Sequence, residues 1–129
     1  MSIMRNAVRA ASGRIEQLPD GGWSRHFCFA NDSAVFSGHF PGRPVLPAVV
    51  QILLAQITLE DCLPAFVLAR VPQAKFFMPV GPHTDIVLHI SPGRKPFLWV
   101  CVLSCGEAVA ARFQLEGDVY EAASSSCPS

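Results

Sequence analysis

The stretch that decides the fold reads Phe36-Ser-Gly-His-Phe-Pro-Gly-Arg-Pro-Val-Leu-Pro47 and continues directly as AVVQILLAQITL over residues 48–59. Three prolines restrict the first part, since proline fixes φ and favours the first turn of a helix. The second part is apolar on almost every side, which predicts a helix over residues 47–61 that is buried nearly all round. A rigid loop therefore holds His39 close to the N–H groups of a helix start, which suits acid–base chemistry on a carbonyl compound.

On both sides of this helix, the apolar residues follow the two-residue period of β-strands. Ile86, Leu88 and Ile90 alternate with their neighbours, whereas residues 97–103 are continuously apolar, as in a central strand. The predicted strands cover residues 13–18, 23–30, 71–77, 84–90, 97–104 and 107–116, and the last of them has Val109, Ala111, Phe113 and Leu115 on one face. One buried helix among five or six antiparallel strands indicates an α+β fold.

The composition is that of one apolar globular domain. The chain has 129 residues, of which 50% are hydrophobic and 16% charged, and its formal net charge is zero. We expect a single domain over residues 1–121 and a disordered tail over residues 122–129. The absence of a basic surplus argues against a nucleic-acid partner.

The cysteines and the N-terminal sequence indicate a cytoplasmic protein. The five cysteines form no Cys-x-x-Cys pair, so we expect free thiols and no metal site. The first residues lack the apolar core of a signal peptide. The longest uncharged stretch is too short and too rich in proline to cross a membrane, so we expect no membrane partner.

The segment GHFPGRPVLPAVVQ over residues 38–51 resembles the signature of the β-hydroxyacyl-thioester dehydratases of the hot-dog fold. These enzymes act on acyl chains carried by acyl carrier protein or coenzyme A. Val-Leu-Pro with a glutamine four residues later is most similar to the branch that serves aryl-polyene pathways. Residues 74–80 and 106–111 show weaker similarity to two later strands of that family. The resemblance implies a sheet wrapped around one helix, a homodimer, a fatty-acid or polyketide type of metabolism and no cofactor.

The resemblance also implies roles for individual residues. Elimination of water from a 3-hydroxyacyl thioester requires a base for the α-proton, donors for the thioester oxygen and an acid for the departing hydroxyl. His39 takes the place of the base, and the backbone N–H of Ala48 takes the place of the oxygen donor, where the family has glycine. The residues expected to contact substrate are Phe40, Gly42, Pro47, Gln51, Leu53 and Phe76. A purely structural role remains open for His39 and for Gln51, because a buried glutamine must find hydrogen-bond partners.

Leu53 departs from the family pattern. It stands fourteen positions after His39, where the family has its catalytic acid, and leucine cannot transfer a proton. Glu60 shares the helical face of Leu53 but lies about 10 Å further along the axis. The sequence therefore predicts a weakened dehydratase. The alternatives are a hot-dog subunit that binds acyl thioesters or stabilises a partner without turnover, and a thioesterase.

Two further partners follow from the resemblance and the charges. We expect a homodimer with the His39 loop close to the subunit boundary. We also expect an acyl carrier protein, which is acidic, to dock on exposed cations. The candidates for this contact are Arg43, Arg70, Lys75, Arg94 and Lys95.

Overall fold

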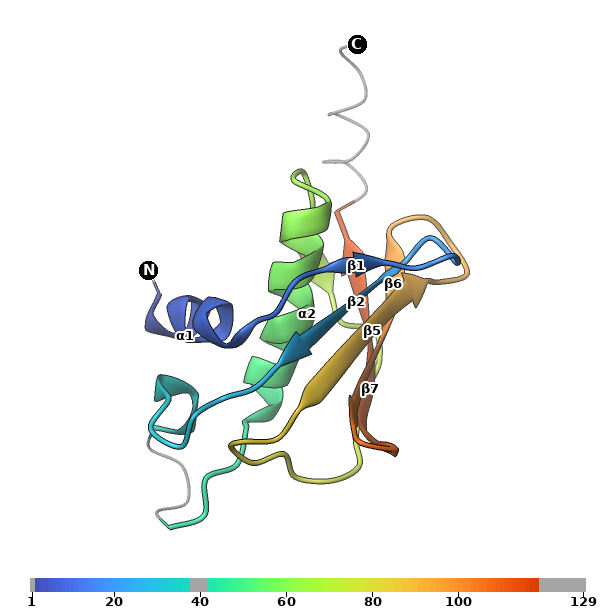
Figure 1. The fold of residues 1–129 in the computed structure, drawn as a ribbon. Helices are drawn as coiled ribbons and strands as arrows, with labels where there is room; N and C mark the ends of the chain where they lie inside the picture. The colour runs from blue at the N-terminus through green and yellow to red at the C-terminus, as the bar shows by residue number, and fades with distance from the viewer. Residues whose placement is uncertain (1, 38–41, 119–129) are drawn as a thin grey trace.

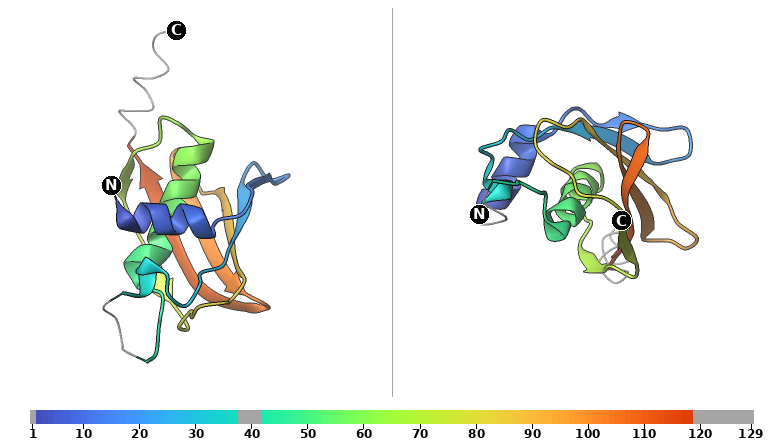
Figure 2. Two further views of the ribbon diagram at one scale, coloured as in Figure 1. Left: turned by 60° about the vertical axis from the view of Figure 1, so that its left-hand side comes forward. Right: turned by 90° about the horizontal axis from the view of Figure 1, so that it is seen from below.

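An antiparallel sheet curves around a central helix in the computed structural model, which describes residues 2–37 and 42–118. The sheet has seven strands in the order β1-β2-β5-β6-β7-β3, and β4 also pairs with β7. The strands are β1 (Glu16–Gln17), β2 (Trp23–Phe27), β3 (Leu68–Arg70), β4 (Ala74–Phe76), β5 (Ile86–Pro92), β6 (Leu98–Cys105) and β7 (Ala108–Gly117). Seen along the helix, the sheet bends around it on one side (Figure 2). The predicted α+β architecture is confirmed.

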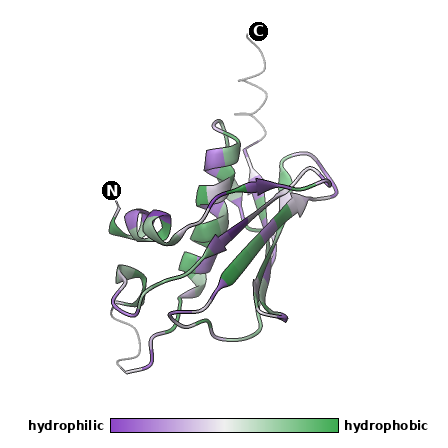
Figure 3. Cartoon of the chain, in the orientation of Figure 1, coloured by the Kyte–Doolittle hydropathy of each residue, from purple (hydrophilic) through white to green (hydrophobic). Residues whose placement is uncertain are grey.

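The central helix, α2, spans Ala48–Cys62 and matches the predicted segment within one residue. It is largely hydrophobic, with hydrophilic colour at its C-terminal end (Figure 3). Leu54 and Ile57 are fully buried against the sheet. The helix ends at Leu63, because the following proline disfavours the helical conformation of the residue before it.

The expectation that α2 is buried nearly all round is wrong for one stripe. Val49 is 72% exposed, and Ile52, Leu53 and Gln56 are half-buried. These positions are spaced by three or four residues and therefore lie on one side of the helix. The sheet covers the opposite side. Periodicity could not distinguish the two sides because both are apolar.

The inner face of the sheet supplies the rest of the core. Ile86, Leu88 and Ile90 are fully buried, as their alternation predicts. β6 lies between β5 and β7, which confirms the central position expected from its continuous apolar sequence.

A β-bulge corrects the prediction for the last strand. Ser104 pairs with Val109 and Leu103 with Ala111, so Ala110 is an extra residue on β7. The bulge shifts the alternation by one residue. Ala110 and Ala111 are both buried, and Val109 is 41% exposed instead of sharing the inner face.

Three predicted strands are shorter than expected. The segment 23–30 is a strand only over Trp23–Phe27. Only Glu16–Gln17 pairs within the segment 13–18. The segment 71–77 contains only β4, and β3 precedes it, because Val71-Pro72-Gln73 interrupts the pairing with β7.

Two elements lie outside the predicted ones, helix α1 (Ile3–Ala11) and the short 3₁₀ helix η1 (Ala34–Phe36). The Ser2 hydroxyl caps α1 by accepting a hydrogen bond from the N–H of Arg5. α1 packs against the C-terminal half of α2. Arg5 pairs with Glu60 at 2.7 Å, and Arg9 pairs with Asp61 at 3.0 Å.

Candidate functional site

The predicted site begins in the loop before α2. His39 and Phe40 lie outside the described residues, as does the predicted tail over residues 122–129. Gly42 is described and exposed, with a φ of +82°, a backbone conformation that favours glycine. Further along, the N–H of Leu46 donates to the Val80 carbonyl at 2.7 Å. This bond fixes the end of the loop against the segment that follows β4.

A depression of about 430 Å³ lies at the N-terminal end of α2. It brings together four of the predicted site residues, Pro47, Ala48, Gln51 and Phe76. Its other described lining residues are Val45, Leu46, Phe77, Met78 and Pro79. The strand β4 and the loop before α2 therefore form one apolar surface beside the helix start.

The backbone N–H of Ala48 points out of the first turn of α2. The N-terminal cap is Pro47, which offers no side-chain hydrogen bond. Bonding within this turn begins with the N–H of Val50, which donates to the Pro47 carbonyl at 3.0 Å. In the part of the chain that the structure describes, the Ala48 N–H has no backbone acceptor. Such an N–H at a helix start favours negative charge, as the oxygen-donor role requires.

Gln51 is 4% exposed and its amide is fixed on one side only. Its Nε2 donates to the Leu46 carbonyl at 3.1 Å. Its Oε1 is buried and has no hydrogen-bond partner within the described ranges. The Nε2 bond links the loop to α2, in agreement with a structural role, and leaves the amide oxygen without a donor among the described residues.

Leu53 does not line this depression. It lies about 160° around the helix from Gln51, in the half-buried stripe. Glu60 does not replace the missing acid, because its carboxylate binds the guanidinium of Arg5 and the amide of Gln56. Among the described residues that line the depression, there is no carboxylate and no histidine.

Phe76 forms the wall opposite the helix. It is 40% exposed and stacks on Phe113, with ring centroids 6.3 Å apart. Phe77, which is not among the predicted site residues, also lines the depression and is 57% exposed. The signal was present, because Phe77 lies in the segment 74–80 that resembles the family.

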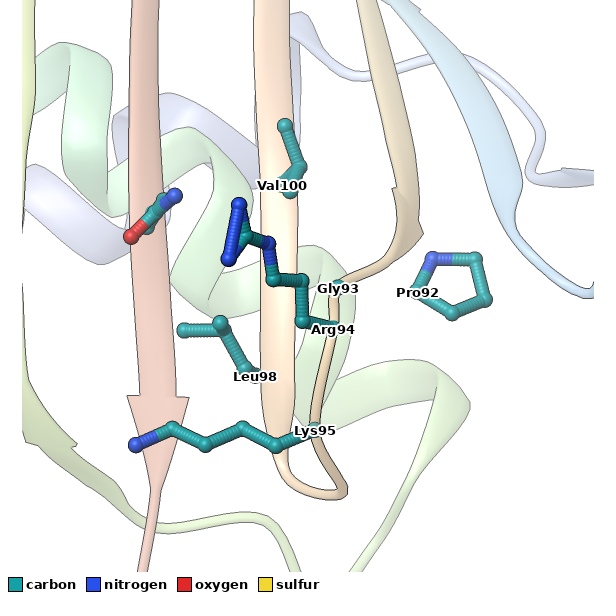
Figure 4. Close-up of a pocket in the computed structure, with 7 residues that line it drawn as sticks. Pro92, Gly93, Arg94, Lys95, Leu98 and Val100 are labelled. Carbon is teal, nitrogen blue, oxygen red and sulfur yellow. The ribbon is translucent and has the colours of Figure 1, made fainter.

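A larger depression, of about 840 Å³, lies on the outer face of the sheet (Figure 4). Arg94, Lys95 and Gln114 contribute its polar side chains. Lys95 lies 3.4 Å from the carboxylate of Glu116, which Arg70 also binds. The hydrogen bond from Arg70 and the charges of both cations hold the pKa of Glu116 below its ordinary value. The sheet separates this charged depression from the start of α2.

The described residues contain neither a cluster that could hold a metal ion nor a membrane-spanning helix. No group of three His, Cys, Asp or Glu side chains in residues 2–37 and 42–118 has metal-binding geometry. No helix in these ranges has the length and hydropathy to cross a bilayer.

Comparison with known structures identifies similar folds. The dehydratase heterocomplex ApeI:P from Xenorhabdus doucetiae is 22% identical, with a TM-score of 0.74, over 82% of this chain and 95% of that one. The dehydratase domain of the polyketide PpsC from Mycobacterium tuberculosis is 14% identical, with a TM-score of 0.61, over 82% of this chain and 43% of that one. A hypothetical thioesterase with coenzyme A from Streptococcus pneumoniae TIGR4 is 12% identical, with a TM-score of 0.59, over 89% and 94%. These likenesses confirm the hot-dog fold.

The family follows from the sequence match. The model of the ApeI-like family, described as ApeI dehydratase, matches residues 17–111. This range is more than half of the chain and includes the loop, α2 and β4. The chain is a dehydratase-like protein that belongs to the ApeI-like dehydratase family.

Proposed function

We propose that this chain binds 3-hydroxyacyl thioesters and eliminates water from them slowly. The observation that carries the proposal is the Ala48 N–H, which has no backbone acceptor among the described residues and lies beside an apolar depression at the start of α2. This geometry suits a thioester whose oxygen binds the N–H and whose acyl chain contacts Phe76. The loop that leads to it carries the family signature.

The chemistry divides between two groups of this chain. His39 removes the α-proton, and the electron pair of the broken C–H bond forms the C=C bond. The negative charge that develops on the thioester oxygen is stabilised by the Ala48 N–H. The C–O bond then breaks, and the hydroxyl must gain a proton to leave as water. With Leu53 in the acid position, solvent has to supply that proton, and loss of a general acid lowers rates about 10²–10⁴-fold.

The second candidate is a subunit that binds acyl thioesters without turnover. Leu53 and the apolar lining of the depression favour it, because neither offers a proton donor. The X. doucetiae protein is described as a dehydratase heterocomplex. By analogy, a non-catalytic chain of this fold would stabilise a catalytic partner.

We also propose a homodimer and an acidic carrier protein as partners. Val49, Phe76 and Phe77 present apolar side chains around the start of α2, which a second copy would cover. On the outer face, Lys75 pairs directly with Arg112 across β4 and β7. Like charges opposite each other are unfavourable, so an acidic surface docked there would be stabilising. The free thiols of the described cysteines support a cytoplasmic location.

A turnover assay with a panel of 3-hydroxyacyl thioesters tests the proposal. We expect slow elimination by the parent, loss of it in His39→Ala, and retention in His89→Ala, which removes an exposed histidine of β5. Tight binding without turnover, unchanged in His39→Ala, would favour the non-catalytic subunit. Turnover that is unaffected by His39→Ala would refute the site assignment.

A further inference from the structure

The buried amide of Gln51 has a fixed orientation. Its Nε2 faces the Leu46 carbonyl, which can only accept a hydrogen bond. Turning the amide over would place two oxygens together, so Oε1 must be the atom without a partner. Buried polar atoms in native proteins are nearly always paired, and an exception calls for a physical explanation.

The position of this acceptor relates it to the proposed thioester site. Gln51 follows Ala48 by three residues, so both lie on the same side of α2. Both line the apolar depression. Val45, Leu46, Phe76, Phe77 and the other described lining residues contribute no side-chain oxygen or nitrogen. Gln51 is therefore the single polar side chain among the described residues of an otherwise apolar wall.

The acceptor requires a ligand with an O–H or N–H group. A saturated acyl chain offers none, whereas a 3-hydroxyacyl chain carries one O–H near its thioester carbon. Three residues rise about 4.5 Å along a helix, which is on the order of the span between a thioester oxygen and its 3-hydroxyl. A chain bound at the Ala48 N–H would thus bring its hydroxyl to the level of Gln51.

We propose that Gln51 Oε1 accepts a hydrogen bond from the 3-hydroxyl of the bound acyl chain. This inference rests on the proposed function and deepens it. It makes Gln51 the residue that distinguishes a hydroxyacyl chain from a saturated one. The bond from Nε2 to Leu46 positions the amide for this contact.

The test compares two unreactive ligands of equal chain length, the 3-hydroxyacyl and saturated acyl amides of aminopantetheine, in which an amine replaces the thiol of pantetheine. Titration calorimetry measures both dissociation constants. We expect the wild type to bind the hydroxyacyl amide about tenfold more tightly, as one hydrogen bond to a buried acceptor allows. Gln51→Met, similar in length but without an acceptor, should bind both equally. Gln56→Met is the matched control, since Gln56 lies on the same helix but does not line the depression, and it should keep the preference.

Each other outcome separates the inference from the function on which it rests. Equal affinities in the wild type would overturn the inference, because Oε1 then makes no contact with the 3-hydroxyl, and would leave acyl binding intact. A preference that persists in Gln51→Met, or in Gln51→Leu if the methionine variant does not fold, would also overturn it. A purely structural glutamine would change the melting temperature but not the ratio of affinities. If the wild type binds neither amide, the proposed function fails together with the inference.

Discussion

Leu53→Glu is the substitution that tests most directly whether the missing acid limits catalysis. It places a carboxyl group at the helix position where the family has its acid. Leu53 lies in the half-buried stripe of α2, so a glutamate there keeps contact with water. We therefore expect the variant to fold. The same stripe contains Val49, which the proposed second copy would cover, so the carboxyl group would face the acyl chain bound by that copy and not the depression of its own chain. If His39 is the base, elimination should be about 10²–10⁴ times faster than in the parent. That gain corresponds to about 3–5.5 kcal/mol of activation free energy.

The neighbouring Leu54→Glu is the matched control. Full burial of a leucine side chain stabilises the folded state by about 1.5–3 kcal/mol. Because Leu53 is only half-buried, Leu53→Glu should lower the free energy of unfolding by about 1–2 kcal/mol. Leu54 is fully buried against the sheet. A carboxylate there has no partner, and the penalty of several kcal/mol approaches the total stability of a typical domain, about 5–15 kcal/mol.

Two measurements decide the outcome. Thermal unfolding should show a modestly lowered midpoint for Leu53→Glu and no cooperative transition for Leu54→Glu. Initial rates with a 3-hydroxyacyl thioester should rise only in the first variant, and the rise should disappear in the double variant Leu53→Glu/His39→Ala. A folded Leu53→Glu protein with the parent's rate would refute the reasoning that the missing acid is the limitation.

Three other substitutions test the fold, its pH dependence and its assembly. Gly22→Ala should lower stability by about 2–4 kcal/mol in denaturant unfolding, because an added Cβ would lie 1.9 Å from the Ile90 carbonyl oxygen. In the control Gly81→Ala the nearest atom to the added Cβ is 3.7 Å away, so stability should change little. Equal losses of stability in the two variants would contradict the register of β2 and β5. Partial burial disfavours the Asp61 carboxylate, but its two arginine partners outweigh this and hold its pKa below the ordinary value. The contribution of the Asp61 carboxylate to folding stability is therefore present above about pH 4 and is lost as the pH falls through the lowered pKa. Asp61→Asn should make the free energy of unfolding less dependent on pH in that acid range. An unchanged pH profile of stability would exclude this linkage. Phe77→Asp should sediment as a monomer at micromolar concentration, where the wild type should sediment as a dimer. A wild type that is itself monomeric would refute the proposed dimer.

The sequence predicted α2 and the inner faces of β5 and β6 because their signals are local. An uninterrupted apolar run bounded by prolines has few alternatives to a buried helix, and strict alternation has few alternatives to a strand. α1 carried a comparable signal, since Met4, Ala7, Val8 and Ala11 follow the spacing of one helical face. Val8 is fully buried. The signal for α1 is therefore as local as that for α2.

Other features depend on pairing between distant segments, and no local pattern encodes them. The extra residue Ala110 changes which side chains of β7 face the core, yet Glu107–Glu116 reads as an ordinary strand. The depression beside Ala48 exists because β4 pairs with β7 and brings Phe76 opposite the helix start. The family motif could place candidate residues in order along the chain, but their common surface required the sheet.

Gln51 and Leu53 show why a motif needs the structure before it can be assigned chemistry. Two positions apart on a helix, their side chains point to nearly opposite sides, and the sheet decides which side is closed. Gln51 lies on the side that the sheet closes, where a hydrogen bond to a buried acceptor is stronger because water does not compete for it. Leu53 lies on the opposite, half-buried side, which the proposed second subunit would cover. A leucine at position 53 therefore leaves the proposed acyl-binding surface around Ala48 and Gln51 unchanged, so the proposed binding and the proposed catalysis depend on different sides of α2.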